Sequence, residues 1–128
     1  MSVENRAINF VIKYEKKQKR KVENVSHSRH VAHRGFDLIS KKGSDVRQIE
    51  VKGTTKENGI PDPYWTEFNL KKRLVATHLY VVYLPDRGRT RLYIIRRNDI
   101  QAKDIELKRG WRISYKFKKY KLPRFIVK

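Results

Sequence analysis

Two short segments near the middle of the chain alternate between apolar and polar side chains. They span residues 36–41 and 48–52, and a period of two is the pattern expected of β-strands. Gly43 and Ser44 lie between them as a Gly-X loop, which supplies the positive φ that a type II′ hairpin turn needs. We therefore predict a β-hairpin over residues 35–54.

The register of this hairpin places two acidic side chains opposite each other. Counting back from a Lys42–Asp45 pair beside the loop puts Asp37 directly opposite Glu50, and directly opposite residues share a face of a sheet. The other face, which we expect to belong to the core, then carries the apolar side chains Phe36, Leu38, Ile49 and Val51. The face that carries Asp37 and Glu50 is predicted to be charged, and Lys52 lies on it as well.

Two carboxylates at a cross-strand pair predict a cation between them. Their Cβ atoms would be about 4.5–5.5 Å apart, and like charges at that spacing destabilise a sheet. A hard divalent cation such as Mg²⁺ or Mn²⁺ binds carboxylate oxygens and would convert this repulsion into a site. Lys52 would reach the same place and hold an attacking water or a phosphate oxygen. The alternative is a charged strand face that is simply solvated.

This arrangement resembles the signature of the PD-(D/E)xK nuclease superfamily, in which an acidic residue on one strand is followed by Asp/Glu-x-Lys on the next. The residues that match are Asp37 and then Glu50-Val51-Lys52. The wider context, GFDLIS followed by RQIEVKGT, is similar to the NO VEIN C-terminal-like domain family, a branch of that superfamily. The resemblance extends from about Asn5 to about Leu84.

The resemblance implies a fold, an activity and a role for each site residue. The implied fold is α/β and restriction-endonuclease-like, with a mixed central β-sheet flanked by helices, and the implied activity is metal-dependent DNA cleavage by an endonuclease. Asp37 and Glu50 would hold Mg²⁺ or Mn²⁺ together with the backbone carbonyl of Val51, and Lys52 would orient the nucleophilic water. Small nucleases of this type often act as dimers, so a homodimer is also implied.

The first predicted helix departs from the family at one position. The family often carries a metal-site Glu in a segment similar to A-I-E-x-V-x-x-Y-E, and this chain has Asn9 in place of that Glu. Glu15 lies about 600° further around the helix, on a different face, so it cannot replace a carboxylate at position 9. Its simplest interpretation is a surface ion pair with neighbouring lysines. The alternative function is therefore a catalytically degenerate nuclease-fold protein that binds nucleic acid.

The remaining periodicity predicts helices and strands on both sides of the hairpin. Apolar residues at helical spacing predict a helix from about Val3 to Lys21, with Ser2 as its N-cap. The continuous apolar run from His78 to Leu84 predicts a central strand that is buried on both faces. Shorter segments predict an edge strand over residues 22–26, a strand over 64–69, a helix over 70–77, a strand over 90–96 and a helix over 98–106.

Composition favours a single domain that binds a polyanion. The chain has 128 residues, the size of one domain, which we assign to 1–128. Its formal net charge of +19, from 32 Lys plus Arg against 13 Asp plus Glu, suits DNA as the partner, with RNA as an open alternative. The sequence has no cysteine, no signal-peptide pattern and no apolar run of about 20 residues. We therefore expect a cytoplasmic, intracellular protein, able to associate with the nucleoid, that does not enter a membrane.

Two basic segments are candidate nucleic-acid contacts. Residues 27–34, HSRHVAHR, carry Arg29 and Arg34 and have a histidine at every third position. A zinc site is the alternative for these histidines, although such a series does not converge on one ion in a helix or an extended loop. The basic aromatic C-terminal segment, about residues 108–128, adds the candidates Lys116, Lys118, Lys119 and Lys121. The alternative for this segment is an edge strand protected by lysines.

Overall fold

The computed structural model describes residues 1–30, 35–55, 64–66, 76–97, 105–109 and 113–117. This part of the chain forms one helix and eight strands: α1 (Val3–Lys17), β1 (Lys21–Asn24), β2 (Leu38–Lys42), β3 (Asp45–Thr54), β4 (Tyr64–Thr66), β5 (His78–Tyr83), β6 (Arg91–Arg96), β7 (Ile105–Arg109) and β8 (Ile113–Phe117). Two sheets result, one of five strands and one of three.

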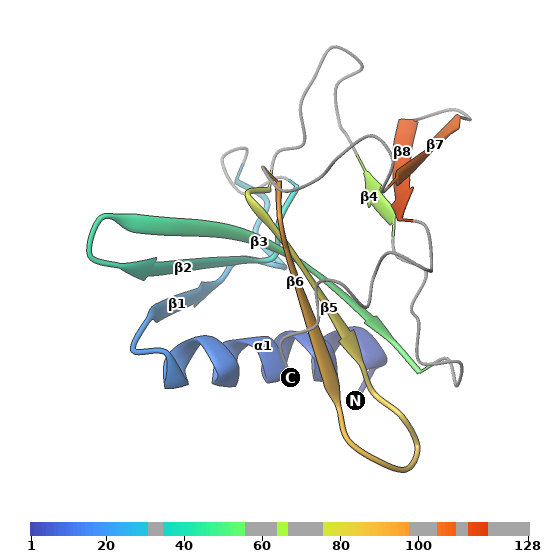
Figure 1. Cartoon of the computed structure of the whole chain (residues 1–128). Coiled ribbons are helices and arrows are strands. Elements are labelled where there is room, and N and C mark those ends of the chain that lie inside the picture. The colour runs from blue at the N-terminus through green and yellow to red at the C-terminus, as the bar shows by residue number, and fades with distance from the viewer. Residues whose placement is uncertain (31–34, 56–63, 67–75, 98–104, 110–112, 118–128) are drawn as a thin grey trace.

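The larger sheet is mixed, as predicted. Its strand order is β1-β2-β3-β5-β6. Neighbouring strands are antiparallel except for β3 and β5, which run parallel. Figure 1 shows α1 lying along one face of this sheet. The three-stranded sheet has the order β4-β8-β7 and is antiparallel throughout.

The predicted hairpin is present as β2 and β3. The residues beside the loop pair as predicted, Leu38 pairs with Ile49, and Gly43 has a positive φ of 60°. The regular pairing ends at Leu38. The Asp37 N–H donates to the Ile49 carbonyl at 2.7 Å, so that Asp37 and Leu38 both lie opposite Ile49. Two residues against one is the geometry of a β-bulge, and it turns the residue before it toward the other face of the sheet.

Both faces of the larger sheet carry an apolar cluster. The cluster on the helix side contains Ala7, Ile8, Val11, Leu38, Ile49, Val51, Tyr80, Val82, Leu84 and Leu92. The cluster on the opposite side contains Val25, Phe36, Ala76, Leu79, Val81, Tyr83, Tyr93 and Ile95. Strand β5 contributes alternately to both clusters, which confirms that it is buried on both faces.

This arrangement corrects two predictions about the hairpin faces. Phe36 does not share a face with Leu38, because the bulge at Asp37 turns it into the opposite cluster. The face of Glu50 is not purely charged either. Glu50 pairs with Leu79 of the parallel neighbour, and Leu79 is fully buried in the apolar cluster on that side.

Helix α1 begins as predicted and ends earlier. The Ser2 hydroxyl accepts a hydrogen bond from the Asn5 N–H at 3.1 Å, which confirms the N-cap. At the other end Lys19 has a positive φ of 64°, and the Arg20 N–H donates to the Glu15 carbonyl at 3.2 Å. This is the hydrogen bond of a Schellman motif, which terminates a helix and reverses the chain. The reversal brings Arg20 back toward the sheet.

The shorter predicted strands are present. The edge strand expected over residues 22–26 is β1, and the strand expected over 90–96 is β6. Strand β4 forms the start of the strand expected over 64–69, whose end lies outside the described residues. No helix within the ranges that the structure describes is long and apolar enough to span a membrane.

Three predictions in the second half of the chain are wrong where the structure describes them. Ile105 and Glu106 do not end a helix, because they pair with β8 and begin β7. Thr77, the last residue of the helix expected over 70–77, is not helical, because its backbone N–H and its hydroxyl bind Gln48 as the chain enters β5. Strand β8 is not an edge strand, because it lies between β4 and β7. The remainder of both expected helices lies outside the described residues.

Close packing of α1 on the sheet depends on a glycine. A Cβ added at Gly53 would lie 2.8 Å from the Ala7 Cβ and 3.1 Å from the Val3 carbonyl oxygen, so the helix approaches β3 closely only because Gly53 has no side chain. This approach fixes the first turns of α1 beside the strand that carries Glu50 and Lys52.

We expect Gly53→Ala to lower the free energy of unfolding by about 1–3 kcal/mol, the usual effect of overpacking a core contact. Urea unfolding of the two proteins measures the difference. In an Ala7→Gly background the same substitution should cost less, because the nearest clashing atom, 2.8 Å away, has been removed. Equal costs in both backgrounds would mean that helix approach is not what requires this glycine.

Candidate functional site

Asp37 lies where β2 parts from β3, and its side chain is held against the neighbouring strand. Its Oδ2 atom accepts a hydrogen bond from the Val51 N–H at 2.8 Å. Beyond the bulge the backbone ladder between the two strands has ended, so the carboxylate takes a position that a backbone carbonyl would fill in a continuous ladder. The bulge therefore attaches the Asp37 carboxylate to the strand that carries Glu50.

Glu50 forms a pair with Asp37. It is half-buried on β3, and its carboxyl group is close enough to the Asp37 side chain for the two groups to affect each other's protonation. Burial is the largest of the causes that raise the pKa of Glu50 to about 9, and the effects of the neighbouring Asp37 carboxylate come next. Glu50 therefore keeps its proton at neutral pH, and the pair carries one negative charge instead of two.

Two further charges act on this carboxyl pair. Lys52 lies two residues along β3 from Glu50 and lowers its pKa, whereas Glu4 in the first turn of α1 raises it. The structure thus brings Asp37, Glu50 and Lys52 together. The sequence pattern does not single out Glu4, since its proximity comes from the packing of the first helical turns on Gly53.

The carboxyl pair offers the oxygen ligands that Mg²⁺ and Mn²⁺ prefer. Among the residues with described positions, no three His, Asp or Glu side chains form a group that could hold a metal ion. Two carboxylates nevertheless fit Mg²⁺, which commonly binds through one or two carboxylates, several waters and substrate phosphates. The N–H of Val51 is taken by Asp37, and a ligand role for its carbonyl stays a prediction.

A protein-family model described as Protein NO VEIN, C-terminal, matches residues 3–95. This span is more than two thirds of the chain and contains α1, the hairpin, β5 and most of β6. The chain belongs to the NO VEIN C-terminal family. A search of curated proteins finds no match to it.

The fold is also similar to the solved structure of a Holliday junction resolvase. The Holliday junction resolvase Hjc of Archaeoglobus fulgidus, an archaeal hyperthermophile, aligns with 99% of this chain and 92% of its own, with 14% sequence identity and a TM-score of 0.59. This likeness and the five-stranded mixed sheet confirm the predicted restriction-endonuclease-like α/β fold.

This NO VEIN C-terminal domain buries a second acidic residue, Glu15, on the helix side. Glu15 is 0% exposed, so the prediction of a surface ion pair with lysines is wrong. Its carboxylate lies 3.5 Å from Arg20 and 3.3 Å from Arg47. Arg20 also donates to the Ser40 hydroxyl at 2.8 Å and contacts the Asp45 carboxylate at 2.8 Å. The sequence gives no local sign of this cluster, because Arg47 is 32 residues from Glu15.

The buried cluster continues onto β5. Arg47 donates to the Tyr80 hydroxyl at 2.7 Å, and burial together with the charge of Glu15 raises the pKa of Tyr80 above its ordinary value. Burial, followed by the positive charge of Arg47, lowers the pKa of His78 to about 4. The cluster therefore links α1, the hairpin and β5 at the end of the helix that lies away from Glu4.

The predicted nucleic-acid contacts are only partly described. Arg29 is exposed, as are His27 and His30. Lys116 lies in β8, where its backbone pairs with Tyr64 and Glu106. Four of the six candidates lie outside the described residues, and so does one histidine of the series: Arg34, Lys118, Lys119 and Lys121, together with His33. Contact of the arginines and lysines with nucleic acid stays a prediction.

We expect the folded domain to lose stability as the pH falls from about 6.5 toward about 4, because of His78. Its ordinary pKa is 6.5 and its folded pKa is about 4, so the unfolded chain binds more protons in this window and acid favours unfolding. Urea unfolding at pH 7 and at pH 4.5 measures the loss. His78→Gln should reduce it, whereas His27→Gln, at an exposed position, should leave it unchanged. An identical pH dependence in all three proteins would exclude His78 as its source.

Proposed function

We propose that this chain is a metal-dependent nuclease that hydrolyses phosphodiester bonds in DNA. The observation that supports this best is the carboxyl pair of Asp37 and Glu50, with Lys52 on the same face of β3. A raised pKa caused by burial and by a second carboxylate is typical of functional sites. Membership of the NO VEIN C-terminal family and the nuclease fold add support.

In this mechanism Asp37 and Glu50 would hold Mg²⁺ or Mn²⁺, and binding of the cation would release the proton that Glu50 retains. The bound ion would polarise the phosphodiester and stabilise charge on its oxygens. Asp37 cannot easily rotate away, because Val51 donates to it. Lys52 would orient the attacking water, and the backbone carbonyl of Val51 is a further candidate ligand.

The charge of the chain supports a nucleic-acid substrate. A net charge of +19 in 128 residues provides a strong attraction for the phosphate backbone. DNA is the proposed partner, and RNA is to be tested beside it. Because the structurally similar protein is a Holliday junction resolvase, branched DNA belongs in the substrate set. A homodimer, which would allow both strands to be cut, is part of the proposal.

A second candidate function is nucleic-acid binding without turnover. Asn9 replaces the usual family Glu, and its exposed amide donates to the Met1 sulfur at 3.4 Å. The helical residues that face the sheet are Ala7, Ile8, Val11 and Glu15. If a third carboxylate is required, Glu4 is the helical residue whose charge reaches Glu50.

Divalent metal should stabilise the wild type and fail to stabilise Asp37→Asn. Asparagine keeps an oxygen that can accept from Val51, so the fold is retained while the charge is lost. Without metal the variant should be at least as stable as the wild type, because the charge of Asp37, which helps to hold a proton on the half-buried Glu50, has been removed. Thermal unfolding with and without Mn²⁺ measures the shift. Equal Mn²⁺ shifts in the two proteins would place metal binding elsewhere.

With Mg²⁺ or Mn²⁺ the purified protein should nick or cut DNA, and Glu50→Gln and Lys52→Met should each reduce the rate by about a hundredfold or more. Duplex, branched and single-stranded DNA and RNA should be tried. Glu23→Gln, at an exposed position of β1, is the matched control and should keep full activity. All three variants should still bind DNA.

The same assay separates the two candidate functions. If Glu4 completes the site, Glu4→Gln lowers the cutting rate. If the missing family carboxylate limits activity, Asn9→Glu raises it. A wild type that binds DNA but cuts no substrate with any divalent ion, and an equally inactive Asn9→Glu, would leave the binding function in place of the nuclease.

A further inference from the structure

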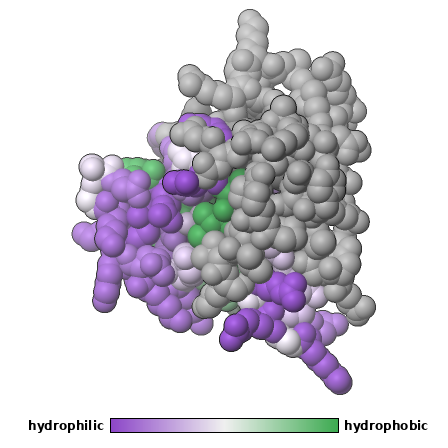
Figure 2. Space-filling view, in the orientation of Figure 1, coloured by the Kyte–Doolittle hydropathy of each residue, from purple (hydrophilic) through white to green (hydrophobic). Residues whose placement is uncertain are grey.

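The turn that joins β5 to β6 is rich in arginine. Residues 85–91, here called the arginine turn, read Pro-Asp-Arg-Gly-Arg-Thr-Arg. Its three arginines are exposed, and with Asp86 they give a local charge of 3 − 1 = +2. Figure 1 draws this turn at the lower tip of the sheet, and Figure 2 shows that tip as hydrophilic. The tip therefore presents positive charge to solvent.

The strand register places the arginine turn on the same face of the sheet as the candidate site. On β3, Lys52 and Thr54 share the face of Glu50, and Thr54 pairs with Tyr83 of β5. Tyr83 in turn pairs with Arg91 of β6, and directly opposite residues share a face. Arg91 lies two strands across the sheet from Lys52 and two residues further along the strand direction. At ordinary strand spacing and rise, the two residues are about 12 Å apart.

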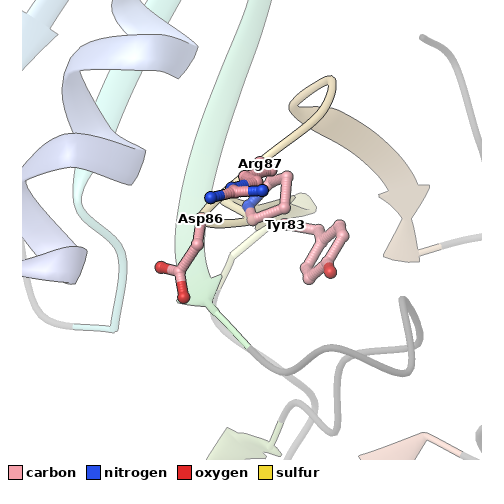
Figure 3. Close-up of a pocket in the computed structure, with 4 residues that line it drawn as sticks. Tyr83, Asp86 and Arg87 are labelled. Carbon is pink, nitrogen blue, oxygen red and sulfur yellow. The ribbon is translucent and has the colours of Figure 1, made fainter.

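A cavity lies beside the arginine turn. It has a volume of about 340 Å³ and is lined by Tyr83, Pro85, Asp86 and Arg87. Figure 3 shows the Asp86 carboxylate pointing away from the Tyr83 ring, with the Arg87 side chain above them. The guanidinium carbon of Arg91 lies 5.9 Å from the centre of the Tyr83 ring. This cation–π contact holds Arg91 at the same place.

The three basic residues of the arginine turn are all arginines, and this indicates what kind of ligand the turn binds. A guanidinium group binds phosphate through two parallel N–H bonds, which an ammonium group cannot form. A span of about 12 Å corresponds to a few nucleotides, because phosphates along one strand follow each other at an axial rise of about 3.4 Å. A nucleic-acid strand that crosses the carboxyl pair can therefore also reach the arginine turn.

We propose that the arginine turn binds backbone phosphates of the nucleic acid a few nucleotides from the bond to be cleaved. The position of that bond rests on the proposed function; binding of phosphate by the turn does not. The contact recognises the phosphodiester backbone and is indifferent to base sequence. Asp86 repels the same phosphates and so weakens the contact.

The first test is a binding titration of a DNA duplex at several salt concentrations without divalent ions. The test variant replaces Arg87, Arg89 and Arg91 by Ala. The matched control replaces Lys13, Lys16 and Lys17, which are exposed on α1, by Ala and removes the same charge. Thermal unfolding establishes that both variants are folded.

The arginine variant should make the slope of log K against log salt shallower by about 0.9 for each phosphate contact that is lost, and the control should change it less. Asp86→Asn should have the opposite effect and tighten binding. Equal effects of the arginine and lysine variants, or weaker binding by Asp86→Asn, would overturn the proposal.

A second test uses the absence of cysteine from the chain. Arg89→Cys and Lys16→Cys each introduce a single thiol. This thiol can attack a pyridyl disulfide tethered to one phosphate of a DNA duplex, which joins protein and DNA by a disulfide and releases the pyridine thiol. Cross-linking should be much faster at position 89 than at position 16. Equal rates would contradict a contact at the arginine turn even if the triple variant folds poorly.

These measurements separate failure of this proposal from failure of the proposed nuclease. Neither test requires cleavage. If the protein cuts no substrate and yet cross-links rapidly through position 89, the proposed nuclease is refuted and the arginine turn is supported. A protein that cuts DNA while the arginine and lysine variants bind alike refutes only the arginine turn.

Discussion

The carboxylate of Glu15 is enclosed by protein, and the position of α1 depends on how it is neutralised. A buried charge without a partner is strongly unfavourable, and removal of one partner from a buried ion pair typically costs about 3–5 kcal/mol. Glu15 has two partners, Arg20 just after the helix and Arg47 on β3. These two ion pairs therefore favour the register in which the helix docks on the sheet. That register sets the first turn of α1 against Gly53, next to the strand that carries the candidate site.

The buried cluster around Glu15 and the half-buried pair of Asp37 and Glu50 differ in how their charges are balanced. Around Glu15, two arginines neutralise one carboxylate, and these ion pairs stabilise the packing of the helix on the sheet. Around Asp37 and Glu50, two carboxylates share one proton, and Lys52 only partly offsets their charge. Folded proteins tolerate such unfavourable local arrangements chiefly where function requires them. The contrast distinguishes a structural cluster from a candidate chemical one within a single domain.

The sequence predicts those features of the fold that depend on local pattern. The N-cap at Ser2, the Gly43 loop and the buried run of β5 each follow from neighbouring residues, and each is present. The bulge at Asp37 could not be predicted, because alternation alone places Phe36 on the face of Leu38. The early end of α1 could not be predicted either, because Lys19 takes the left-handed conformation that glycine usually adopts after a helix.

The residues of the candidate site also divide into those that local sequence pattern predicts and those that it does not. Asp37, Glu50 and Lys52 lie on the two strands of a predictable hairpin, so their proximity could be inferred from the sequence. The predicted direct pairing of Asp37 with Glu50 is wrong, because the bulge sets Asp37 against Ile49. Glu4 approaches Glu50 only through the docking of α1, and the partners of Glu15 come from distant segments. Contacts between distant segments have no periodic signature in a single sequence.

The parallel pairing of β3 with β5 has a consequence for the order of folding. Helix α1 and the hairpin are continuous in sequence, whereas parallel neighbours require a long crossover connection and form non-local contacts that close slowly. Asp37 and Glu50 belong to the first part, and Tyr83 and Arg91 to the part that docks later. We therefore expect the hairpin that carries the acidic pair to form before β5 pairs with it. The face of the sheet that carries Glu50, Lys52 and Arg91 is therefore complete only when β5 and β6 have docked.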